Sequence, residues 1–395
     1  MIKYRTMIKG RAAATLLVLG CILALGDCFS NSFARREGRL VGGGNVERKS
    51  FSSVVIKSSD DDNDEEIPIP TSDVVQKVAV TGATGKTGKL VVEELLKRNV
   101  KVVGLVRNET KAAELFGDFS SDVLEIQKCN LSDKNEIANA LEGCDATIWC
   151  ATGFSDGAAS SQMPPTATMS PEQSIDVMGI PAVASAMLGS GDKEQSYPKV
   201  VMCSSAGTTR PSWDEEKKQR LKGCAEIPIV RLNPFGILGL KAQSEQKLRE
   251  AGTEYCIVRP CGLNDNWPAG ARPVFSQGDV AVGRLNRKDL ATVLCDVLSL
   301  PEACYKTFEV IGLAGYPPPR GIGPALDRLK LDSEDLSDAE IEAAYAFAQQ
   351  LLPGERQDAA ALAMGQTYEQ LDKGETGRLG ERGKERAPGY VPTSA

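Results

Sequence analysis

A glycine-rich run that follows a short apolar segment sets the strongest limit on what this chain can fold into. The run reads Thr81-Gly-Ala-Thr-Gly-Lys-Thr-Gly88, with apolar residues at 78–80 before it and an amphipathic stretch at 90–96 after it. A strand, a turn with this glycine spacing and a helix form the unit that binds a dinucleotide pyrophosphate at the helix N-terminus. The predicted contact residues are Thr81, Gly82, Thr84, Gly85, Lys86, Thr87 and Gly88.

Two other interpretations of the run are weaker. One is a glycine-rich turn without a ligand, and the flanking strand and helix count against it. The other is a P-loop for nucleoside triphosphates, because Gly85-Lys86-Thr87 matches the last residues of that motif. A P-loop needs a further glycine at position 80, where this chain has Val80.

The end of the next apolar segment, at 101–106, predicts which dinucleotide binds. An NAD site places Asp or Glu at this point to bind the ribose 2′-hydroxyl, whereas this chain has Arg107. A guanidinium suits a 2′-phosphate, and Lys86 can add a second positive charge. The sequence therefore favours NADP(H). The alternative is that Arg107 is a solvated charge at a strand end, and Glu109 is the main argument for NAD(H).

Apolar segments recur along the chain with helical patterns between most of them. They lie at 77–81, 101–106, 123–129, 146–151, 199–204, 255–259 and 307–311. Such alternation predicts an α/β fold with a doubly wound parallel sheet of the Rossmann type, followed by a C-terminal helical extension.

Several further motifs resemble those of one family, the atypical short-chain dehydrogenase/reductases of the NmrA-like kind. Plastid proteins similar to the NADP-binding subunit of the chloroplast inner-envelope translocon are the nearest in pattern. The resemblance covers about residues 77–312, and its landmarks besides the glycine run are Leu105-Val-Arg, Cys150-Ala-Thr-Gly, Met202-Cys-Ser-Ser, Tyr255-Cys-Ile-Val-Arg-Pro-Cys-Gly-Leu and Arg287-Lys-Asp-Leu-Ala.

The resemblance implies further contacts with the cofactor. Asn130 and Leu131 would flank the adenine, and the Arg259-Pro260 turn would approach the nicotinamide ring. The nicotinamide ribose would be lined by Ala151, Thr152 and Gly153. Two positions depart from the family pattern, because Asn130 replaces an aspartate and Cys261 replaces the glycine that follows Arg-Pro.

The largest departure concerns catalysis. Active members of the wider superfamily use Tyr-x-x-x-Lys, in which the phenol delivers a proton. Here Lys241 matches the lysine, just ahead of a predicted helix at 242–250, and Ile237 stands at the tyrosine position. The chain has no histidine either. Ser204 and Ser205, at a predicted strand end, or a bound water are the remaining proton sources, although serines at strand ends usually satisfy backbone groups.

Two functions from different classes follow from these residues. The first is an NADPH-dependent reductase that acts on a small molecule, with Lys241 orienting the cofactor. The second is a non-enzymatic, dinucleotide-binding scaffold or assembly factor for a photosynthetic complex. Retention of Lys241 favours the reductase, and loss of the tyrosine favours the scaffold, so enzymatic activity is left open at this point.

Composition excludes several other classes. A net charge of −7 argues against nucleic-acid binding, which needs a basic surface. The eleven cysteines form no Cys-x-x-Cys pair, and without histidine they predict no metal site. Several lie in apolar segments, which indicates buried thiols in a reducing compartment.

The first 58 residues predict a two-part targeting leader. Basic residues precede an apolar run at 12–25, as in a signal peptide, and the run is short for a membrane span. A Ser- and Arg-rich stretch from Phe29 then has the form of a transit peptide. This arrangement resembles the leaders of algae with secondary plastids and predicts a chloroplast protein, in the stroma or on the thylakoid membrane, with no transmembrane segment after processing. Secretion is the alternative.

The remaining segments complete the predicted domain organisation. An acidic linker at 59–72 is predicted to precede a dinucleotide-binding domain at 73–314, a helical extension at 315–372 and a mixed-charge, disordered tail at 373–395. Within the domain, residues 153–171 are predicted to form a lid over the substrate or an ordinary loop. In the extension, Ser337-Asp-Ala-Glu340 is a capping box that predicts a helix to Leu352, and a second helix is predicted at 357–371.

Overall fold

A computed structural model describes residues 69–152, 169–189 and 196–351 of the chain. Eight strands form one twisted sheet in the order β3-β2-β1-β4-β5-β6-β10-β8. Its parallel strands are β1 (Lys77–Thr81), β2 (Lys101–Val106), β3 (Leu124–Lys128), β4 (Ala146–Trp149), β5 (Val200–Cys203), β6 (Tyr255–Pro260) and β10 (Lys306–Leu313). The predicted α/β fold, a doubly wound Rossmann-type sheet, is confirmed, and all seven predicted strands are present.

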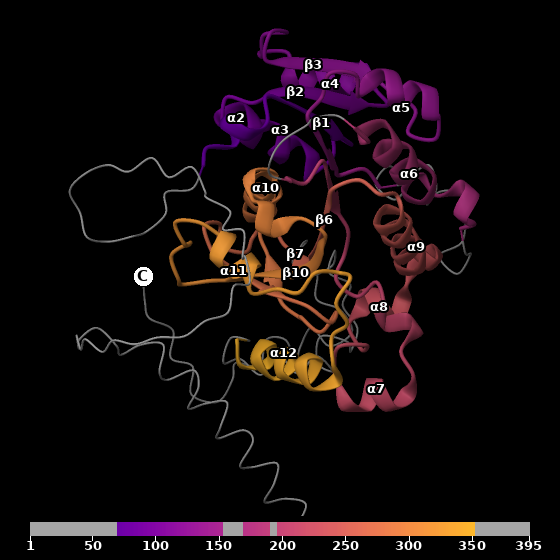
Figure 1. Cartoon of the computed structure of the whole chain (residues 1–395), viewed down its shortest axis with the longest axis vertical. Coiled ribbons are helices and arrows are strands. Elements are labelled where there is room, and N and C mark those ends of the chain that lie inside the picture. Colours follow the sequence, from indigo (N-terminus) through magenta and orange to yellow (C-terminus); the bar gives the residue numbers. More distant parts are fainter. Residues whose placement is uncertain (1–68, 153–168, 190–195, 352–395) are drawn as a thin grey trace, which may run out of the picture. The chain divides into compact units, whose positions relative to one another are not determined.

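Helices cover both faces of the sheet (Figure 1). On one face α3 (Gly88–Lys97) and α10 (Arg287–Asp296) contribute the apolar side chains of the first core cluster. On the other face α5 (Lys134–Ala140), α6 (Ile175–Met187) and α9 (Ile237–Glu250) pack on β1, β4, β5 and β6. The shorter helices α4 (Glu109–Phe116), α7 (Glu215–Arg220) and α8 (Pro228–Leu232) lie in the connections.

The sheet departs from the sequence-based prediction at one edge. Strand β8 (Arg272–Ser276) pairs antiparallel with β10, whereas a wholly parallel sheet was predicted. Strands β7 (Gly262–Leu263) and β9 (Arg284–Leu285) form a separate two-stranded sheet. These strands are short, and β8 contains Pro273, which weakens a strand pattern but is tolerated at a sheet edge.

The ends of the described region bear on the predicted boundaries. Residues Thr71–Val74 form helix α2, whose first two residues belong to the predicted linker. The leader, the second C-terminal helix and the tail lie outside the described residues. Among the helices that are described, none is long and apolar enough to span a membrane.

The predicted capping box is confirmed. Ser337 caps helix α12 (Asp338–Gln350), and Glu340 bonds back to the Ser337 backbone N–H at 2.8 Å. The extension packs on the Rossmann-type domain rather than standing apart. Leu326 of α11 (Gly323–Asp327) joins the first core cluster, and α12 lies beside α7, where Arg220 pairs with Asp338 (Figure 1).

Candidate dinucleotide-binding site

The glycine run forms a tight turn between β1 and α3. Gly82 has a φ of +63°, and a Cβ at this position would lie 2.8 Å from the Ala151 Cα. A Cβ on Gly88 would lie 2.8 Å from the Gly82 carbonyl carbon and closer still to its oxygen. The Gly85 N–H donates to the Gly82 carbonyl at 2.9 Å. Glycine is thus required for the left-handed turn and for close contact between the turn, α3 and the end of β4.

Thr81 links this turn to the neighbouring strand. Its buried hydroxyl oxygen accepts hydrogen bonds from the backbone N–H groups of Cys150 and Ala151, at 3.1 and 3.2 Å. The contact fixes the start of the loop that follows β4. Ala151 is buried and Thr152 half-buried in that loop, while Gly153 lies outside the described residues.

Two basic residues stand at the carboxyl ends of β1 and β2. Lys86 is exposed in the glycine turn, and Arg107 is exposed directly after β2, whose Leu105 pairs with Thr81 in the parallel register. Glu109 is the first residue of α4, whose N-cap is Asn108. The helix dipole favours a carboxylate at that position. The presence of Glu109 is therefore explained without a contact to a cofactor ribose.

Asn130 and Leu131 follow β3 at the same edge. The Asn130 side-chain oxygen accepts from the Ser132 N–H at 3.1 Å, and the Asn130 N–H donates to Glu136 at 2.7 Å. The asparagine thereby shapes the turn at which adenine contacts were predicted. Leu131 is buried, 8% exposed, against the second core cluster.

Lys241 is held by a carboxylate that sequence reasoning missed. Its Nζ lies 3.5 Å from Oδ1 of Asp176, a residue of α6 that is 1% exposed. The same Oδ1 accepts the indole N–H of Trp149, the last residue of β4, at 2.9 Å. No local pattern links these residues, because they lie on three different elements. An acidic residue in the first turn of an apolar helix was the one available signal.

The predicted start of the helix around Lys241 was wrong. Helix α9 begins at Ile237 instead of residue 242, so Lys241 lies inside it. The start is set by Gly236, in the left-handed region at a φ of +72°, and by the Asn233 side chain, which accepts the Leu238 N–H at 3.0 Å. Ile237 and Lys241 are four residues apart on one helix.

Ile237 faces an apolar cluster. It is 7% exposed and belongs to the third core cluster, together with Trp213, Val280 and Val282. Its assignment to the tyrosine position stays a prediction from the motif.

The two candidate serines have different surroundings. Ser204 is buried, and its hydroxyl donates to Glu245 at 2.6 Å. Glu245 also accepts from the guanidinium of buried Arg259, with Nε at 2.9 Å. Ser205 is half-buried, and its hydroxyl donates to the adjacent Ala206 carbonyl at 2.9 Å. Ser204 therefore belongs to a buried charged network, whereas the hydrogen bond of Ser205 is local.

The turn that ends β6 joins the same edge of the sheet. Pro260 is the last residue of β6, and Cys261 donates its N–H to the Val310 carbonyl at 3.0 Å. The Cys261 thiol is buried beside the Ala281 carbonyl at 3.3 Å. The position that is glycine in the family pattern is therefore filled by a small apolar side chain that packs inward.

Two thiols stand at the carboxyl ends of β4 and β5. Burial raises the pKa of Cys150 well above its usual range and that of Cys203 to about 11, while the positive charge of Lys241 opposes both shifts. The Lys241 ammonium pairs with Asp176, which accepts the indole N–H of Trp149, the last residue of β4, so the pair lies near the carboxyl ends of the central strands. In a doubly wound sheet that edge is where ligands bind.

A second buried network, also missed by sequence reasoning, supports the loop after β5. Asp279 accepts from the Gly207 and Thr209 N–H groups at 2.6 and 2.8 Å. Fully buried Arg210 donates to the Asp279 carbonyl at 2.7 Å, and Glu309 accepts from the Asp279 N–H at 3.0 Å. Burial, together with the Asp279 charge, raises the pKa of Glu309 to about 7.

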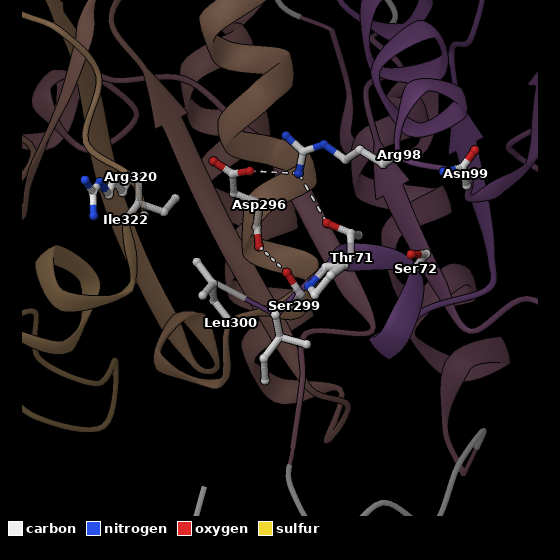
Figure 2. A pocket seen from close by; sticks show the side chains of 12 residues that line it. Thr71, Ser72, Arg98, Asn99, Asp296, Ser299, Leu300, Arg320 and Ile322 are labelled. Atoms are coloured by element: carbon white, nitrogen blue, oxygen red, sulfur yellow. Dashed lines mark hydrogen bonds and ion pairs between the residues drawn. The ribbon is translucent and has the colours of Figure 1, made fainter. Parts of the chain in front are cut away.

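A cavity of about 400 Å³ lies at the opposite edge of the sheet. Figure 2 shows that Arg98, just before β2, points toward Thr71 and Asp296 there. Its Nη1 lies 2.7 Å from Asp296 and 3.2 Å from Thr71. These polar groups satisfy one another, and the cavity is separate from the residues predicted to bind a cofactor.

The residues at the carboxyl edge fit a dinucleotide. The glycine turn leaves no room for a side chain, α3 has no acidic residue in its first turn, and exposed cationic groups follow it. An anion is favoured at such a helix N-terminus. In the described ranges no group of acidic residues and cysteines has the arrangement of a metal site.

Fold and site together define a Rossmann-type protein with a dinucleotide cradle. The model of the NAD(P)H-binding family matches residues 82–301, and the chain belongs to this family. The resemblance to NmrA-like atypical short-chain dehydrogenase/reductases is thereby confirmed, and binding of a nicotinamide dinucleotide is a property of the family.

Curated relatives are similar over most of the chain. An uncharacterized chloroplastic protein of Arabidopsis thaliana is 27% identical over 280 residues, which cover 69% of this chain and 87% of the relative. Sanguinarine reductase of Eschscholzia californica is 29% identical, covering 64% and 93%. Protein TIC 62 of Pisum sativum is 27% identical, covering 59% of this chain and 42% of the pea protein.

Solved structures are similar at a lower level. A short-chain dehydrogenase/reductase from Veillonella parvula in complex with NADP has a TM-score of 0.44 at 14% identity, covering 62% of this chain and 99% of that structure. The anaerobilin reductase ChuY from Escherichia coli has a TM-score of 0.43 at 18% identity, covering 61% and 100%.

Proposed function

We propose that this protein is a plastid NADP(H)-dependent oxidoreductase that reduces a small molecule. The observation that carries the proposal is the ion pair of Lys241 with Asp176, a buried carboxylate that also accepts the indole N–H of Trp149, the last residue of β4. The end of β4 is at the edge of the sheet at which the glycine turn also lies. The glycine turn and this buried cation support a single cofactor site at that edge.

NADP(H) is proposed over NAD(H) because of the charges beside the glycine turn. Arg107 and Lys86 are exposed at the ends of β2 and β1. A 2′-phosphate can accept charge-assisted hydrogen bonds from both. Glu109, the residue that favoured NAD(H), has its own role at the N-terminus of α4.

In the proposed reaction, the cofactor and the residues of this chain would have separate roles. Bound NADPH supplies a hydride, which is chemistry of the cofactor. Lys241 would hold the nicotinamide ribose, as the family resemblance implies, and Ser205 or a water would deliver the proton. Ser204 is the weaker proton source, because its hydroxyl already donates to Glu245.

A purified full-length protein tests the proposal directly. NADPH oxidation would be followed against aldehydes, ketones, quinones and flavins, with NADH as the comparison cofactor. We expect turnover with at least one acceptor class and a preference for NADPH. Tight NADPH binding without turnover in any class would contradict the reductase and favour a scaffold.

A non-enzymatic scaffold for a photosynthetic complex is the second candidate. The burial of Ile237 in an apolar cluster favours it, because this motif position offers no proton donor. Similarity to TIC 62 is compatible with association in a protein complex. Co-purification of the tagged chain from plastid membranes, with and without NADP⁺, would separate this function from a soluble reductase.

Plastid localisation is part of the proposal. Chloroplastic relatives and the two-part leader pattern support it. A fluorescent reporter fused to residues 1–58 should label plastids, and deletion of residues 29–58 should leave it in the secretory route. Secretion of the reporter with the complete leader would contradict the proposed localisation.

A further inference from the structure

The environment of Asp176 points to a role beyond balancing a charge. The side chain is 1% exposed, and one oxygen, Oδ1, both accepts the Trp149 indole N–H and faces Lys241 Nζ at 3.5 Å. Burying a carboxylate is costly unless it is paired and hydrogen-bonded. Here both conditions are met, and the partner Trp149 is the last residue of β4, at the carboxyl edge of the sheet.

The backbone is adapted to this contact. Gly179 lies one turn after Asp176 on α6, and a Cβ there would lie 2.5 Å from the Trp149 ring and 2.7 Å from the Leu131 carbonyl oxygen. Glycine therefore lets α6 approach the indole closely enough for Asp176 to reach it. Lys247 donates to the Val177 carbonyl at 3.2 Å and joins α9 to α6 one further turn along.

We propose that Asp176 is the positioning residue for Lys241. Trp149 holds the carboxylate, the carboxylate holds the ammonium, and the ammonium is thereby presented to the ribose hydroxyls of the bound dinucleotide. A flexible lysine contributes more to binding when its geometry is fixed in advance. This inference rests on the proposed cofactor site. It assigns to α6 a function in binding the cofactor ribose, which the glycine turn does not provide.

A double-mutant cycle measured by NADPH binding to the full-length protein tests the inference. Asp176→Asn keeps the shape and an acceptor for Trp149 but removes the charge, and Lys241→Met removes the ammonium. Each should weaken NADPH binding by about tenfold, since a charge-assisted contact is lost. In the Lys241→Met background, Asp176→Asn should cause no further loss, because Asp176 acts through Lys241.

Control variants separate positioning from general support of the fold. Ser174→Ala removes the N-cap of α6, whose hydroxyl accepts the Val177 N–H at 3.4 Å, without changing the ion pair. It should lower the melting temperature and leave NADPH affinity unchanged. Trp149→Phe removes the indole donor and keeps both charges, so it should weaken binding severalfold even if Asp176→Asn fails to fold.

Three results would overturn the inference. They are equal affinity in wild type and Asp176→Asn, equal losses from Asp176→Asn in both backgrounds, and unchanged affinity in a folded Trp149→Phe variant. A failure of the proposed function looks different, because the cycle is read by binding alone. A chain that binds NADPH, follows the expected cycle and reduces no acceptor would refute the reductase while supporting the role of Asp176.

Discussion

The hydroxyl of Ser204 donates a hydrogen bond of 2.6 Å to Glu245, a carboxylate that is fully buried beside Arg259. Ser204 stands at the end of β5, where a substrate carbonyl would lie in a short-chain reductase. Its hydrogen is nevertheless directed into the protein, toward α9. The bond joins β5 to the buried ion pair between α9 and β6, which gives Ser204 a structural reason for its position.

Ser204→Ala should therefore lower stability more than Ser205→Ala. Loss of a hydrogen bond to a buried charge costs about 1.5 to 3 kcal/mol, whereas loss of the local Ser205 bond should cost no more than about 1.5 kcal/mol. Urea unfolding of both variants measures the difference. If Ser204→Ala abolished NADPH oxidation while leaving the free energy of unfolding unchanged, Ser204 would be a catalytic residue instead.

Arg107→Ala should reduce the preference for NADPH over NADH. Removal of a charge-assisted contact to the 2′-phosphate costs about 1.5 to 3 kcal/mol and should affect NADPH alone. Calorimetric titration of the full-length protein with both cofactors gives the two affinities. Glu109→Gln is the matched control, because Glu109 begins α4 and should not change the preference. Equal affinities for the two cofactors in wild type would contradict the NADP(H) assignment.

Local sequence patterns predicted most of the fold and the geometry of the glycine turn. Two such features are the turn with glycines at 82, 85 and 88 and the capping box at Ser337. Each involves residues close together in the chain, so the spacing of these residues predicts the local geometry. Strand β8 was not predicted. It is defined by its pairing with β10 at the edge of the sheet, and its own residues show no strand pattern.

The buried contacts around Ser204 and Asp176 could not be predicted in the same way. Ser204 and Glu245 are 41 residues apart, and Trp149 and Asp176 are 27 apart. Their pairing depends on how α6 and α9 pack on the sheet, which no local spacing encodes. The sequence therefore identified Lys241 through a motif, whereas its only signal for Asp176 was an acidic residue in the first turn of an apolar helix.

Gly88→Ala should destabilise the protein and weaken NADPH binding. The new Cβ would overlap the Gly82 carbonyl, so α3 would have to move away from the turn that forms the cradle. Overpacking of this kind costs about 1 to 3 kcal/mol. Gly239→Ala is the control: Gly239 lies in α9 with no atom near a new Cβ, and it should leave stability equal or raise it by up to about 1 kcal/mol. Equal behaviour of the two variants would contradict this account of the turn.

Glu309 should make stability fall as the pH rises toward neutrality. Its pKa in the folded protein is about 7, raised from the ordinary 4.5 by burial and by Asp279. The folded state therefore binds a proton that the unfolded state has lost, and the resulting stabilisation is complete below about pH 4.5 and lost by about pH 7. The contribution is on the order of 3 kcal/mol.

Glu309→Gln isolates this effect, because an amide does not titrate in this range. Urea unfolding at several pH values should give a wild-type free energy that declines relative to the variant between about pH 4.5 and 7. Parallel pH dependences for the two proteins would show that Glu309 remains ionised in the folded state, held by the neighbouring arginines Arg210 and Arg259.

Ile237→Tyr should lower the melting temperature and leave NADPH affinity unchanged. Ile237 is 7% exposed among Trp213, Val280 and Val282, so a phenol would overpack this cluster at a cost of about 1 to 3 kcal/mol. Ile237→Val, which removes a methylene, is the control and should cost about 0.5 to 1.5 kcal/mol. A general acid typically contributes about 10²- to 10⁴-fold to rate. If the tyrosine variant instead kept its stability and gained carbonyl reduction on that scale, residue 237 would face the substrate, and loss of the tyrosine would be what limits this enzyme.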